Sequence, residues 1–99
     1  MPISVKITDS DKKDKRMMAI FRIHKGGKII KITHFGSPKH SNYTIHKDKK
    51  RKANYLKRHK KNEDWNDFKS AGSLSRYILW NKPTLEASIK DYKNRFDLD

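Results

Sequence analysis

The side chains best suited to chemistry in this sequence are six cations that recur within a stretch of fifteen residues. Their spacings of three, four and seven residues place them on one face of a helix. They are Lys47, Lys50, Arg51, Lys57, Arg58 and Lys61. Lysine offers a mobile point charge and arginine a forked donor, and both bind phosphate oxygens. The pattern therefore predicts a phosphate-binding face, although a helix surface kept soluble by its charge would have the same composition.

Few carboxylates lie near enough in the sequence to neutralise these cations. Asp48 lies within the segment, and Glu63 and Asp64 follow it. Unpaired like charges at helical spacings repel each other by roughly a few tenths of a kcal/mol per pair. A polyanionic partner would relieve that repulsion. Three cations elsewhere in the chain would extend the face if the fold brings them to the same side: Lys39, Arg76 and Lys82.

Aromatic side chains interleave with the cations and could stack on unpaired bases. Because the chain is poor in aliphatic residues, we expect most of its aromatic residues to be needed in the core. Tyr43 and Trp65 are the best candidates for stacking, since they lie in loops or at the end of an element. Nothing in the sequence resembles a base-reading motif, so the expected recognition is of phosphates and shape.

Metal binding and catalysis find little support in the residues present. The chain has no cysteine, which excludes a zinc site with thiolate ligands, and the three histidines between residues 34 and 46 match no metal motif. A metal-dependent nuclease needs several carboxylates near a histidine. The acidic residues of the 63–67 segment have no histidine nearer than His59, and they are interpreted as helix-flanking or salt-bridging groups. We therefore expect a non-enzymatic protein without a metal, a cofactor or a small-molecule substrate.

The composition supports an anionic partner. Lysine and arginine number 25 against 11 aspartates and glutamates, which gives a formal net charge of +14, and only 33% of the 99 residues are hydrophobic. The length allows one domain, residues 1–99, with a thin core. No apolar run approaches the roughly 20 residues that span a bilayer, and Met1 leads into a short alternating stretch rather than a signal peptide. We expect a soluble protein that is neither secreted nor inserted in a membrane.

The first third of the chain has the pattern of a three-stranded antiparallel β-meander over about residues 3–35. Ile3, Val5 and Ile7 alternate with polar residues, and the 17–24 segment is apolar and rich in β-forming residues. Gly26-Gly27 has the composition of a two-residue hairpin turn with positive φ at both positions. A return strand over residues 29–35 follows. The fold class predicted is α+β, with the helical part over about residues 44–96.

Three helices are expected after the meander. The first, the basic helix over residues 45–61, would begin at Thr44 as N-cap and bury an apolar sector that includes Ile45 and Tyr55. The second would be capped by Ser70 or Ser73 and is apolar nearly all round as far as Trp80, so we expect it to be central.

The third helix has the clearest apolar stripe in the chain. Thr84 is its expected N-cap. The stripe follows at spacings of four, three and four residues and consists of Leu85, Ile89, Tyr92 and Phe96. We expect this face to pack on the core and to be necessary for folding.

The second half of the chain also carries a series of motifs. They are Tyr43-Thr44-Ile45-His46-Lys47-Asp48, Arg51-Lys52, Tyr55-Leu56, Arg58-His59-Lys60, Glu63-Asp64-Trp65, Ala71-Gly72, Leu74-Ser75-Arg76, Ile78-Leu79-Trp80-Asn81-Lys82-Pro83-Thr84-Leu85, Ser88-Ile89, Asp91-Tyr92 and Arg95-Phe96. In these motifs the chain resembles a family of small, functionally uncharacterised proteins encoded by nucleocytoplasmic large DNA viruses, the giant viruses and their relatives. The resemblance covers residues 35–96 and departs at Phe68, where proline is expected.

The resemblance implies a viral origin and a location in the virion, the host cytoplasm or the viral factory, and it brings no catalytic residues. Together with the charge pattern, it predicts sequence-nonspecific binding of nucleic acid, with double-stranded DNA as the expected partner, in genome packaging. The alternative is a minor capsid or other structural virion protein whose basic face contacts acidic shell proteins or the inner membrane. A small nuclease is a third class.

Overall fold

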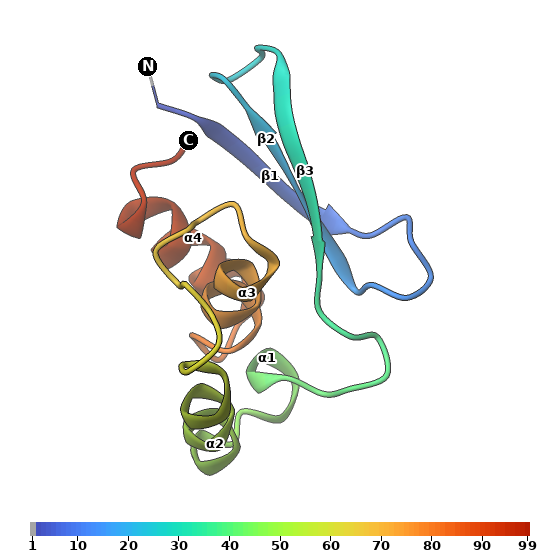
Figure 1. Ribbon diagram of the computed structural model, residues 1–99, viewed down its shortest axis with the longest axis vertical. Helices are drawn as coiled ribbons and strands as arrows, with labels where there is room; N and C mark the ends of the chain where they lie inside the picture. Colours follow the sequence, from blue (N-terminus) through green and yellow to red (C-terminus); the bar gives the residue numbers. More distant parts are fainter. Residues whose placement is uncertain (1) are drawn as a thin grey trace.

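Three antiparallel strands and a set of helices on one side of them make up the fold (Figure 1). The structure is a computed structural model and describes residues 2–99. The strands are β1 (Ser4–Asp9), β2 (Met17–Arg22) and β3 (Ile29–Phe35), in the sheet order β1-β2-β3. Ile7 pairs with Ala19 on β2, which in turn pairs with Thr33 on β3. The predicted α+β class and the order of meander and helices are confirmed.

The hairpin between β2 and β3 is longer than the glycine pair predicts. The N–H of Ile23 donates to the carbonyl of Lys28 at 2.9 Å, and the N–H of Gly27 donates to the carbonyl of His24 at 2.8 Å. Of the two glycines, only Gly26 has a positive φ, of 78°. The expectation of a two-residue turn with both glycines left-handed is therefore wrong. The tight turn is centred one residue earlier, with Gly26 at its third position, where some turn types need positive φ.

The predicted basic helix is divided into α1 (Tyr43–His46) and α2 (Lys49–His59). Lys47 ends α1 with a left-handed φ of 54°, and its N–H donates to the carbonyl of Tyr43. Asp48 then caps α2, its Oδ1 accepting from the backbone N–H groups of Lys50 at 3.0 Å and Arg51 at 3.2 Å. The prediction of one helix over residues 45–61 is wrong, because an aspartate side chain competes for backbone amides and favours a helix start.

Thr44 does not cap a helix as predicted. Asn42 caps α1 instead, with its Oδ1 accepting from the N–H of Thr44 at 3.0 Å. Ile45 is 55% exposed, so its expected place in a buried apolar sector is also wrong. The break at Lys47 changes the helical phase, and the apolar sector that the sequence suggests exists only from α2 onward, where Tyr55 is buried.

The other two predicted caps are confirmed. Ser70 begins α3 (Ala71–Leu74), its Oγ accepting from the N–H of Ser73 at 3.1 Å. A π-helical turn, η1 (Ser75–Leu79), continues directly from α3. Thr84 begins α4 (Leu85–Arg95), its Oγ1 accepting from the N–H of Ala87 at 3.2 Å.

The core lies between one face of the sheet and the α3–η1 and α4 helices. Its fully buried or nearly buried members are Val5, Met17, Ala19, Phe21, Phe35, Leu74, Ile78, Leu79, Tyr92 and Leu98. The expectation that the helix ending at Trp80 is central is confirmed, because Leu74 and Ile78 are fully buried. The α4 stripe is buried at Tyr92, whereas Leu85 at its start is 36% exposed.

The β1 edge of the sheet is extended by the C-terminus, and the face of the sheet away from the helices is exposed. The C-terminal Asp99 extends the β1 edge, with its N–H donating to Ile3 and its carbonyl accepting from Val5, both at 2.9 Å. The face away from the helices exposes apolar side chains on β3, where Ile30 is 42% and Ile32 46% exposed. Within residues 2–99, no helix has the length and apolar character that crossing a membrane requires.

Candidate functional site

Four of the six lysine and arginine residues of α2 form an exposed row. Lys50 and Lys57 are seven residues apart, as are Arg51 and Arg58, so each pair returns to nearly the same side of the helix. All four side chains are exposed. We call these four residues the α2 row.

The two outer members of the predicted set lie beyond α2. Lys47 is in the linker to α1, where its Nζ donates to the carbonyl of Thr44 at 2.9 Å, and Lys61 follows the helix. Both are exposed, as are Lys39 and Lys82. The predicted cationic face is therefore centred on the four residues of the row.

No carboxylate pairs with the α2 row among the residues that the structure describes. The ion pairs found there join His34 to Asp11, His59 to Glu63 and Arg95 to Asp91. Asp48 is the acid nearest in sequence to the row, and its carboxylate oxygen accepts from the first backbone amides of α2.

The start of α2 adds to this unpaired charge. Its first turn contains no acidic residue and begins Lys49-Lys50-Arg51. The partial positive charge at a helix N-terminus favours anions and disfavours cations. The carboxylate of Asp48 already accepts from the first amides of α2, so the positive potential at this end comes from the three cationic side chains.

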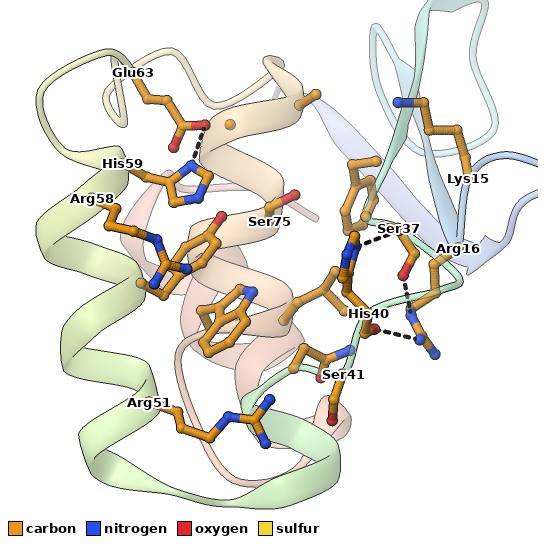
Figure 2. Close-up of a pocket in the computed structure, with 18 residues that line it drawn as sticks. Lys15, Arg16, Ser37, His40, Ser41, Arg51, Arg58, His59, Glu63 and Ser75 are labelled. Carbon is orange, nitrogen blue, oxygen red and sulfur yellow. Dashed lines mark hydrogen bonds and ion pairs between the residues drawn. The ribbon is translucent and has the colours of Figure 1, made fainter.

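Beside the row lies a cavity of about 570 Å³. Figure 2 shows Arg51 and Arg58 extending from α2 on one side of it, with Lys15 and Arg16 on the opposite side. Arg16 is held in place, because its guanidinium donates to the carbonyls of Ser37 at 3.3 Å and His40 at 2.9 Å. These contacts fix the segment between β3 and α1 as one wall of the cavity.

A stack of aromatic rings forms part of the opposite wall. The ring centroids of Tyr55 and Trp80 are 4.2 Å apart with an interplanar angle of 4°, and His59 stacks on the other face of Tyr55 at 4.1 Å. Tyr55 is buried, and this burial raises the pKa of its hydroxyl well above the ordinary value. The hydroxyl therefore stays neutral at physiological pH, and the wall combines apolar ring surface with uncharged polar groups.

The acidic 63–67 segment contributes one carboxylate to this cavity, that of Glu63. Glu63 accepts from the indole N–H of Trp65 at 3.1 Å and lies 3.3 Å from Nδ1 of His59. Glu63, one of the acids interpreted as helix-flanking or salt-bridging groups, thus forms a hydrogen bond with His59 that becomes an ion pair when the imidazole is protonated. This pair orients the end of α2 and the following loop.

Two residues predicted for the binding face are structural instead. Tyr43 is only 6% exposed, with the Nζ of Lys52 lying 4.9 Å from its ring centroid, so the prediction that it offers a free stacking surface is wrong. Arg76 is also wrongly assigned to the face. Its guanidinium lies over the rings of Trp65 and Tyr77 and donates to the carbonyl of Trp80 at 2.9 Å, and burial lowers its pKa.

The expected role of Trp65 in stacking stays a prediction. Its indole N–H is bound by Glu63, and the Arg76 guanidinium carbon lies 5.4 Å from its ring centroid. The side chain is half-buried. Sequence reasoning missed Lys15 and Arg16, because they end a wholly polar loop between β1 and β2 and belong to no periodic pattern.

Elsewhere in the part of the chain that the structure describes, a histidine meets an acid in the pair of His34 with Asp11. No group of three or more histidine, aspartate or glutamate side chains within residues 2–99 is placed to hold a metal ion. His34 hydrogen-bonds Ser10 at 2.7 Å, and His40 hydrogen-bonds Ser37 at 2.9 Å, so these histidines contact serines near the ends of strands.

Comparison with known proteins gives one match. Residues 5–59 match a family described as a family of unknown function (DUF5754). This segment runs from β1 to the last residue of α2 and so contains the whole α2 row together with Lys15 and Arg16. No curated protein and no solved structure matches the chain.

Proposed function

We propose that this chain, which belongs to the family of unknown function DUF5754, binds nucleic acid without sequence preference through phosphate contacts of the α2 row. The observation that carries the proposal is the row itself, four exposed cations spread from the first to the last turn of α2, with no carboxylate paired to them in residues 2–99. Phosphate contacts of this kind fix position and supply affinity but carry no sequence information.

The length of the row suits a duplex. Residues seven apart in a helix are separated by about 10 Å along its axis. Each strand of duplex DNA presents one phosphate charge per about 3.4 Å of the axis, so a span of this length passes about three phosphates on each of the two strands that border a groove. The exposed Lys47 and Lys61 at the two ends add flexible cations that would follow the backbone further. Double-stranded DNA is therefore the proposed partner.

The test is direct binding of purified, nuclease-treated protein to fluorescein-labelled 20-base-pair duplexes of three unrelated sequences at low salt. Equal affinity for the three is expected, because the proposed contacts are to phosphates. A dissociation constant that differs by tenfold or more between sequences would contradict phosphate-only recognition, and an absence of binding at 50 mM salt would contradict the proposal itself. Incubation of plasmid with the protein and magnesium or manganese, with no cleavage, tests the expectation that the protein is non-enzymatic.

A second candidate function is favoured by the exposed face of the sheet. Ile30 and Ile32 lie on the side of β3 that no helix covers. Exposed apolar side chains of this kind are common where a protein partner docks. This fits a structural virion protein that uses its basic face toward acidic shell proteins or the inner membrane.

Both candidate functions include the viral origin that the sequence resemblance implies. The first candidate is a protein that binds the viral genome during packaging, and the second is a structural protein of the virion shell. Mass spectrometry of fractionated virions distinguishes them. A structural component should appear at a fixed ratio to shell protein, whereas a genome binder should follow the DNA fraction.

A further inference from the structure

Building on the proposed function, we infer that the cavity beside α2 accepts one unpaired nucleotide of the bound nucleic acid, with its phosphate on the arginines and its base against the ring wall. The chemistry recognised is that of a nucleoside phosphate. The cavity lies between α2, the α3–η1 helix and the segment from β3 to α1 (Figure 2).

The size of the cavity fits this ligand. Pockets for small organic ligands enclose about 300–1,000 Å³, and this cavity encloses about 570 Å³. A phosphate ion alone would fill only a small part of it. The space therefore suits a group that carries a larger body beside its phosphate.

The charge of the lining suits an anion. Four cationic side chains, those of Lys15, Arg16, Arg51 and Arg58, line the cavity against the single carboxylate of Glu63. That carboxylate is already engaged by Trp65 and His59. The guanidinium of Arg16 already donates to backbone carbonyls, so Arg51 and Arg58 are the arginines that would bind phosphate through paired N–H donors, which strengthens the interaction beyond simple charge.

The apolar part of the lining suits a base. Phe35, Tyr55 and Leu79 line the cavity but are buried, and both faces of the Tyr55 ring are covered by Trp80 and His59, so the half-buried indole of Trp80 is the aromatic surface that a base would contact. Nucleobases stack on aromatic side chains in sites for single-stranded nucleic acid, and this stacking tolerates all bases. A wall of this kind beside arginines favours a nucleotide over a phosphorylated peptide, which presents no planar ring next to its phosphate.

The geometry favours a nucleotide within a strand over a free one. Arg51 and Arg58 belong to both the α2 row and the cavity lining, so a backbone that follows the row passes the entrance of the cavity. A nucleotide displaced from the stack would reach the cavity without the strand leaving the row. Displacing a base costs a few kcal/mol in a perfect duplex and least where the base is already unpaired, so bulges and single strands should be preferred.

The experiment compares three labelled DNAs: a perfect 20-base-pair duplex, the same duplex with one central bulged adenosine, and the same duplex with an abasic bulge. The bulged adenosine should bind about fivefold tighter or more than the perfect duplex, because stacking of one base contributes at least this factor. The abasic bulge should bind like the perfect duplex, since it keeps the phosphate and lacks the base.

Two variants locate the effect. Ala71→Trp places an indole at an exposed position of α3 that lines the cavity, and it should abolish the preference for the bulge while leaving duplex affinity unchanged. Ala87→Trp is the matched control, at an exposed position of α4 outside the cavity lining, and it should keep the preference. Circular dichroism of both variants verifies that the fold is retained.

The outcomes separate this inference from the proposed function. Equal binding of all three DNAs, or a preference that survives Ala71→Trp, would overturn the nucleotide site and leave phosphate binding by the row intact. An absence of binding to any of the DNAs at 50 mM salt would overturn the proposed function. Calorimetric titration with deoxyadenosine monophosphate tests the source, because a free nucleotide that binds as tightly as the bulged duplex would overturn the assignment to a strand.

Discussion

Replacing Arg51 and Arg58 together with alanine should halve the salt dependence of DNA binding. Each phosphate contact contributes about −0.9 to the slope of log K against log salt concentration. Four contacts from the α2 row give a slope of about −3.6, so raising salt from 50 to 200 mM should weaken wild-type binding about 150-fold. The double variant keeps two contacts, for a slope of about −1.8 and a loss of about 12-fold over the same range.

The assay is fluorescence anisotropy of a labelled 20-base-pair duplex, titrated at four salt concentrations between 50 and 200 mM. A matched control, Lys28→Ala with Lys90→Ala, also removes two positive charges at exposed positions, but outside α2. This control should keep the wild-type slope of log K against log salt concentration. The slope depends on the number of phosphate contacts, whereas the effect of distant charges on binding is screened by salt. Circular dichroism should show the same fold and melting temperature for both variants, since the replaced side chains are exposed.

One result would refute the reasoning. A folded Arg51→Ala/Arg58→Ala protein that retains the wild-type slope would show that these arginines contact no phosphate. The α2 row would then be a solvated surface or a contact for another protein. If the control variant reduced the slope as much as the arginine double variant, DNA binding would depend on the total charge of the protein and not on a defined face.

The remaining predictions concern stability and are each checked by thermal melting or denaturant unfolding. A chain truncated before Asn81 should show no cooperative transition, because it lacks Tyr92, which is fully buried. Trp80→Ala should lower the free energy of unfolding by about 3 kcal/mol, the low end for this change because the ring is half-buried against Tyr55. A variant as stable as wild type would remove Trp80 from the packing. Burial alone would raise the pKa of Asp91, but hydrogen bonds from Asn81, at 2.6 Å, and from a neighbouring arginine outweigh it and hold the pKa below its ordinary value. A carboxyl with a lowered folded-state pKa contributes stability above its unfolded value of about 4 and loses it as pH falls further. Asp91→Asn should therefore be less stable at pH 7 and lose less stability than wild type between pH 5 and 3.

The sequence predicts local features of this fold well where a residue type has one main structural role, such as alternating isoleucine and valine in a strand or serine and threonine at a helix N-cap. The alternation of Ile3, Val5 and Ile7 predicts β1, and Ser70 and Thr84 both cap the helices expected to follow them. The same reasoning fails at Thr44. Asn42 caps α1 and Asp48 caps α2, on either side of Thr44, so two helix starts replace the single one expected.

One part of the candidate site can be predicted from the sequence and the other part cannot. The α2 row is visible in the sequence because periodicity places Arg51 and Arg58 on one face. The cavity is not visible, because Arg16 comes from the loop after β1 and Trp80 from the end of η1, and only the packed fold brings them near α2. Residues far apart in the sequence that meet through tertiary contacts leave no periodic signal.

The break between α1 and α2 connects the local sequence to the proposed chemistry. A continuous helix over residues 45–61 would have placed Lys49, Lys50 and Arg51 in its interior, with the Asp48 carboxylate free to pair with a cation one turn away. Because Lys47 adopts a left-handed conformation, Asp48 becomes a cap and its carboxylate binds backbone amides. The three cations then stand in the first turn, and the carboxylate of Asp48 is held on the backbone amides instead of pairing with one of their side chains. One backbone break thus keeps the nearest acid in the sequence on backbone amides and away from the cations of the α2 row, the surface on which the proposed function depends.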